Sequence, residues 1–199
     1  MTGAFRCCQA PLGPRTLAHG AVRPGLTETF AQVVGSLFSC LQAQEGAWLG
    51  REGPQPLPSI GPSSAISAEA PTIDAARLLA SYGTNVRDLQ AILGSILEPE
   101  TAEALAGAAE SPSPALRFPD DLWAATVHQF FSAHRDGVMR REHITQALLP
   151  LYLGRAGAFV LAHAGSSAAT VASALEALCV EFERAKPYLV RRWTRTHTR

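Results

Sequence analysis

Apolar residues recur every three or four positions along much of this chain, which is the spacing that one face of a helix requires. The clearest run is FAQVVGSLFSCL, residues 30–41, where apolar residues fall at offsets 0, 3, 4, 7, 8 and 11. A helix with such a stripe must bury it against other elements. Thr27 is the predicted N-cap, because its hydroxyl can accept a hydrogen bond from a free amide of the first turn.

The same periodicity continues through the chain, with breaks that divide it into separate helices. It resumes at Asp74, is predicted to break at the YGTN sequence of residues 82–85, and restarts after Asn85. A further helix is predicted between Pro119, which suits a first helical turn, and Gly137, which suits a helix end. The predicted fold class is therefore mainly α, a helical bundle from about residue 25.

The most apolar stretch is HITQALLPLYLGRAGAFVLAHAG, residues 143–165. It is about as long as a membrane span, but Pro150 and Arg155 interrupt it, and a charge at bilayer depth is costly. No membrane span is predicted. Instead we expect a buried segment in which a kink or a new helix begins at Pro150, because proline cannot donate the backbone hydrogen bond. Pro187 is expected to kink or stop the last helix in the same way.

Two segments lack helical periodicity. In residues 1–24, Phe5–Leu12 predicts a short strand, followed by a loop dense in Pro and Gly. Residues 50–71 contain repeated prolines among Gly and Ser, which predicts a long loop or linker. The predicted organisation is a strand and loop in residues 1–24, then a helical domain in residues 25–199 that contains the proline-rich loop.

Charge and cysteine usage exclude several classes of protein. The 17 basic and 17 acidic residues cancel, so no nucleic-acid partner is indicated. The four cysteines follow neither a zinc spacing nor a disulfide framework, and the first residues carry no signal-peptide core. We therefore expect reduced thiols and a cytoplasmic protein.

Residue patterns identify no catalytic centre by themselves. The sequence has no Gly-rich phosphate loop, no GxSxG, no HExxH and no Asp-x-Asp motif. His128 and His134 are six residues apart, which places them on different faces of a helix, so they do not form a chelating pair.

The order of several motifs nevertheless resembles a known family. FRCCQAPLG, FAQVVGSLFSCL, FPDDLWAATVHQFF, LLPLYLGRAGAFV and LCVEFERAKPYLVRRW together resemble the C-terminal half of bacterial GT-A glycosyltransferases of the mannosylglycerate synthase-like type. The resemblance implies that residues 1–24 are the last strand and loop of a truncated nucleotide-sugar domain, and that residues 25–199 are the helical C-terminal domain. It also implies transfer of a hexose from a nucleotide-sugar to a small, glycerate-like acceptor, by a chain that is inactive alone.

The resemblance also implies site residues and a divalent metal, Mg²⁺ or Mn²⁺. His19 is the only histidine in the loop that matches the family's last metal ligand, although it lies later than that ligand, whose place Leu17 takes. Tyr152 and Arg155 are candidates for acceptor binding, since an Arg fork can hold a carboxylate or phosphate. The alternative is structural: Tyr152 packs, and Arg155 pairs with a neighbouring acid or caps a carbonyl.

A second function class stays open, a non-catalytic helical interaction module. If residues 3–24 are the edge of a missing domain, they expose an unpaired strand, and the helix of residues 30–41 loses part of its cover. Self-association, or stabilisation by the missing half, is then expected.

Overall fold

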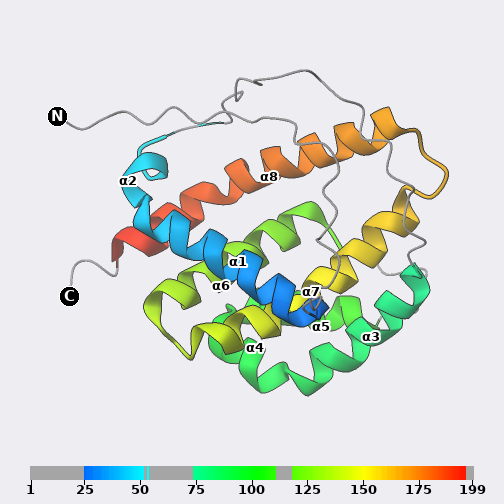
Figure 1. The fold of residues 1–199 in the computed structure, drawn as a ribbon, viewed down its shortest axis with the longest axis horizontal. Coiled ribbons are helices and arrows are strands. Elements are labelled where there is room, and N and C mark those ends of the chain that lie inside the picture. The colour runs from blue at the N-terminus through cyan, green and yellow to red at the C-terminus, as the bar shows by residue number, and fades with distance from the viewer. Residues whose placement is uncertain (1–24, 52, 54–73, 111–117, 196–199) are drawn as a thin grey trace, which may run out of the picture. The chain divides into compact units, whose positions relative to one another are not determined.

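The structure is a computed structural model that describes residues 25–51, 53, 74–110 and 118–195 (Figure 1). These residues form eight helices and no strand, which confirms the mainly α prediction. The predicted strand Phe5–Leu12 and nearly all of the proline-rich segment lie outside the described residues. The helices are α1 (Leu26–Ala43), α2 (Glu45–Trp48), α3 (Ala75–Asp88), α4 (Gln90–Ile96), α5 (Pro99–Glu110), α6 (Asp120–Asp136), α7 (Arg141–Ala162) and α8 (Ala168–Arg195).

Helix α7 packs against three helices, α1, α3 and α6. Its contact with α3 depends on glycine, because a Cβ at Gly154 would lie 2.4 Å from Cδ2 of Tyr82 and one at Gly157 would lie 3.1 Å from Cβ of Leu78. Such close approach of two helices requires residues without side chains. Tyr82 is fully buried there, and its hydroxyl donates to the Leu105 carbonyl at 2.9 Å, which ties α5 to the same core.

Helix α6 is buried nearly all round, because it contacts α1, α5, α7 and α8. Its aromatic residues join a cluster that links the ends of three other helices. Phe131 packs against Phe38 of α1, Trp48 of α2 and Trp193 of α8, with ring centroids 4.7 to 6.0 Å apart. Leu189 and Trp193 are the only buried residues of α8, so this helix is held mainly by its C-terminal half.

Some helix ends match the sequence prediction and one does not. Asp74 caps α3 by accepting from the Arg77 amide at 3.0 Å. Helix α6 begins at the residue after Pro119 and ends just before Gly137, its C-cap, which has a positive φ of 64°. Helix α1 begins earlier than predicted. Gly25, rather than Thr27, takes the N-cap position, and its amide donates to the Glu28 carboxylate at 3.0 Å.

The predicted break at residues 82–85 is wrong, because α3 runs through them to Asp88. Gly83 lies where α5 approaches, with the Ala109 carbonyl 3.1 Å from the position a Cβ would take. The Asn85 side chain bonds back to Ser81 within the helix at 2.9 Å instead of starting a new one. Tertiary packing here overrides the weak helix propensity of Gly and Asn.

The two helix prolines do not end their helices. Pro150 lies inside α7 and Pro187 lies inside α8, so neither begins a new helix nor stops one. Among the described helices, α7 is long and apolar enough to cross a membrane by length and composition, and half of its most apolar window is buried against other helices.

Candidate functional site

The two acceptor-binding candidates lie on α7, next to the start of α6. Arg155 donates through Nη1 to the Phe118 carbonyl at 2.8 Å and forms an ion pair through Nη2 with Asp120. Its side chain is nearly buried, whereas about a third of the Asp120 side chain is exposed. Segments 35 or more residues apart in sequence are therefore joined by one guanidinium.

Local sequence explains why these groups meet at this point. Pro119 precedes the first residue of α6, and Asp120 and Asp121 fall in the first turn, where the helix dipole favours negative charge. The Asp121 carboxylate accepts from the Leu122 amide at 2.8 Å. Asp120 is left to pair with Arg155, which reaches it from the neighbouring helix.

Tyr152 lies on α7, one helical turn before Arg155. Its ring centroid is 5.1 Å from that of Phe30 on α1 and 6.4 Å from that of Trp123 on α6. Even so, 42% of the residue is exposed. Among the described residues no hydrogen bond is recorded for its hydroxyl, so Tyr152 combines a packed ring with a polar group at the surface.

The positive charge of Arg155 is balanced by the carboxylate of Asp120. Burial lowers the pKa of the Arg155 guanidinium, and the neighbouring Asp120 carboxylate opposes that effect. An arginine stays protonated in a protein despite such a shift, so the pair is a charged one. Its observed bonds are those of the structural alternative, since Arg155 both pairs with an acid and caps a carbonyl. These bonds engage two of the five N–H groups of an arginine.

The metal prediction rests on a residue that the structure does not describe. His19 lies outside the described residues. Within the described ranges, no group of three His, Cys, Asp or Glu side chains is close enough to hold a metal ion. The two buried histidines of α6 point to different neighbours, since His128 packs edge-on against Phe182 and His134 against Phe38.

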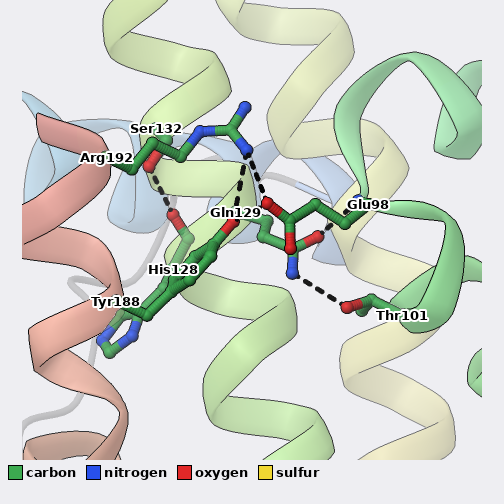
Figure 2. Close-up of polar contacts among 7 residues, drawn as sticks. All are labelled: Glu98, Thr101, His128, Gln129, Ser132, Tyr188 and Arg192. Atoms are coloured by element: carbon green, nitrogen blue, oxygen red, sulfur yellow. Dashed lines mark hydrogen bonds and ion pairs between the residues drawn. The ribbon is translucent and has the colours of Figure 1, made fainter. Parts of the chain in front are cut away.

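A second polar cluster, which sequence reasoning missed, joins α5, α6 and α8 (Figure 2). The buried Gln129 side chain accepts from the Glu98 amide at 2.7 Å and donates to the Thr101 hydroxyl at 2.8 Å. The Tyr188 hydroxyl lies 2.6 Å from the Glu98 carboxylate and 3.2 Å from Arg192. The pKa of Tyr188 is raised, first by burial and then by its bond to Glu98.

This second cluster holds helix ends together. Glu98 immediately precedes α5, so Gln129 satisfies an amide at the start of that helix, which the helix itself cannot pair. Because it joins helix ends, we assign this cluster a structural role. Its signal in the sequence was faint: a single Gln among the apolar residues of α6, and a Glu before a Pro.

No protein-family model, curated protein or solved structure matches this chain.

Proposed function

We propose that this chain is the helical portion of a glycosyltransferase of the mannosylglycerate synthase-like type, and that it contributes contacts to a small, glycerate-like acceptor. A nucleotide-sugar domain, in the same polypeptide or in a second chain, supplies the hexose donor site and the divalent metal, Mg²⁺ or Mn²⁺. One observation supports the proposal most: two segments that carry the resemblance, FPDDLW and LYLGR, meet at the ion pair of Arg155 with Asp120.

The chemistry of these side chains suits a hydroxy acid. The N–H groups of Arg155 beyond its two observed bonds can donate to an acceptor carboxylate. The partly exposed Asp120 carboxylate can accept from an acceptor hydroxyl, and the Tyr152 hydroxyl can donate or accept. In this proposal the three residues bind and orient the acceptor, while His19 is the candidate metal ligand. The chain alone is inactive.

The alternative is a non-catalytic helical interaction module, and a feature of α1 favours it. Leu26, Val33 and Leu37 are each more than half exposed. Their separations of seven and four residues place them along one side of the helix. An exposed apolar row of this kind is a common feature of contact surfaces.

A transfer assay separates the two functions. Labelled nucleotide-hexoses, Mg²⁺ or Mn²⁺ and D-glycerate are incubated with the purified chain, alone and together with the nucleotide-sugar domain of a mannosylglycerate synthase-like enzyme. We expect product only from the mixture, and less of it with Arg155→Lys. The matched control is Arg77→Lys, an exposed arginine on α3. Product from the chain alone, or product unaffected by Arg155→Lys, contradicts the proposal.

A further inference from the structure

A hollow of about 290 Å³ lies between α1, α6 and α8, and it shares no residue with the Arg155 cluster. Its wall is mainly apolar. It includes Leu37 and Leu41 of α1, Trp48 of α2, Val127 of α6, and Phe182 and Leu189 of α8. Helices α1 and α8 both contact α6, and side chains of all three helices line the space. Leu37 is 53% exposed there, so apolar surface faces solvent at this point.

Polar groups in this wall are few and specific. His128 lines the hollow, is 8% exposed, and its Nδ1 atom has no hydrogen-bond partner among the described residues. Figure 2 shows the His128 ring beside the α8 ribbon. In a neutral imidazole one ring nitrogen donates and the other accepts, so His128 adds a polar atom without a partner to an otherwise apolar part of the wall.

The other two polar residues of the wall carry opposite charges. Lys186 Nζ donates to the Arg51 carbonyl at 2.6 Å and lies 3.3 Å from the Glu183 carboxylate. Both Glu183 and Lys186 line the hollow. Glu183 repels the carboxylate of an acidic ligand, and Lys186 repels the ammonium of a basic ligand. A hydroxyl can donate to Glu183 or to His128 and can accept from Lys186.

The volume selects a small occupant. An apolar cavity of about 150 Å³ already holds benzene. The hollow therefore has room for one ring with a substituent. Binding such a ring is favourable because it removes the apolar wall from water.

We propose that this hollow is a binding site for a small, uncharged, apolar molecule that carries a hydroxyl group, such as an alicyclic or aromatic alcohol. The apolar body lies against Leu37, Val127 and Phe182. The hydroxyl group lies among Glu183, Lys186 and His128. The inference does not depend on the proposed glycosyltransferase function, since the two sites have no residue in common.

The test compares four probes that share one ring: cyclohexylmethanol, methylcyclohexane, cyclohexanecarboxylate and cyclohexylmethylamine. Each is titrated into the full chain while the methyl NMR signals of Leu37, Leu41 and Val127 are recorded. We expect saturable shifts with cyclohexylmethanol. The acid and the amine should bind with an affinity at least about tenfold lower. Methylcyclohexane is expected to bind more weakly than the alcohol, because it leaves the polar groups of the wall without a partner.

A matched pair of variants locates the site. Leu37→Glu places a charge in the wall, and Leu175→Glu makes the same change on α8 at an exposed position outside the wall. The first is expected to abolish binding of cyclohexylmethanol and the second to leave it unchanged, with thermal unfolding by circular dichroism as the check on folding. The proposal is overturned if the alcohol shifts no wall methyl, if the acid binds as tightly, or if both variants act alike.

Discussion

Gly154 shows at the scale of a single residue how closely this core is packed. Replacing it with Ala puts a methyl group 2.4 Å from Cδ2 of the fully buried Tyr82, so one helix must move. We expect Gly154→Ala to lower the free energy of unfolding by about 2 kcal/mol, as overpacked cores do. Gly107→Ala on α5 is the control, because nothing lies within 4 Å of its added Cβ. It should be neutral or stabilising in the same urea titration, and equal effects would contradict the packing.

His128 predicts a pH dependence of stability. The pKa of His128 is lowered from the ordinary 6.5 to about 4. Burial is the main cause, a backbone hydrogen bond at Ala185 opposes it, and the charge of Lys186 adds to the lowering. Below pH 6.5 the unfolded chain binds a proton that the folded chain refuses until about pH 4. Stability should therefore fall across that window, by about 3 kcal/mol in total.

The measurement for His128 is the free energy of unfolding at a series of pH values. His128→Leu should flatten the slope between pH 6.5 and 4. It should not remove the slope entirely, because burial and Arg141 also lower the pKa of His134. A slope that is unchanged in the variant would mean that His128 is not the neutral, buried group described above.

At the scale of an element, the start of α5 depends on one side chain of α6. Gln129 satisfies the Glu98 amide and the Thr101 hydroxyl, and it is 2% exposed. Gln129→Leu should cost about 2 kcal/mol, since the buried polar groups lose their partners. Hydrogen exchange at the first turn of α5 should become faster. The control is Gln90→Leu at an exposed position, which should change neither quantity. Equally slow exchange in both variants would contradict the claim that Gln129 stabilises the first turn of α5.

The helices could be predicted from the sequence to the extent that local signals decide them. The apolar stripes, the helix start at Asp74 and the helix end at Gly137 were sufficient, because each depends on residues within a turn or two of its position. The continuity of α3 through Gly83 could not be predicted, since it depends on α5 packing against it.

The sequence singles out Arg155 and Tyr152 as candidates and offers an acid or a carbonyl as the partner of Arg155, but it does not identify the partner residues. Arg155 and Tyr152 stand out as polar groups in an apolar segment. Which acid Arg155 meets depends on the packing of α7 against α6, and Asp120 is 35 residues away in sequence. The buried cluster around Gln129 was missed for the same reason, because its partners come from separate helices.

At the scale of the whole molecule, the exposed row of α1 predicts self-association. Val33 is 61% exposed, and it lies between Leu26 and Leu37 on the same helix. Light scattering of the purified chain should give a mass above that of a monomer, which Val33→Glu should reduce. Val138→Glu, at an exposed valine between α6 and α7, is the control and should keep the higher mass. A wild-type chain that stays monomeric at high concentration would contradict this use of α1.

Acceptor binding at the Arg155 cluster is the central claim, and an NMR titration of the chain with D-glycerate tests it most directly. The signals to record are the Arg155 Nε–H and the Tyr152 ring protons, with glycerol as the control that lacks a carboxylate. We predict saturable shifts of both signals with D-glycerate, an affinity about tenfold lower for Arg155→Lys, and no saturation with glycerol. D-glycerate that shifts neither signal, or that binds no better than glycerol, would contradict the account.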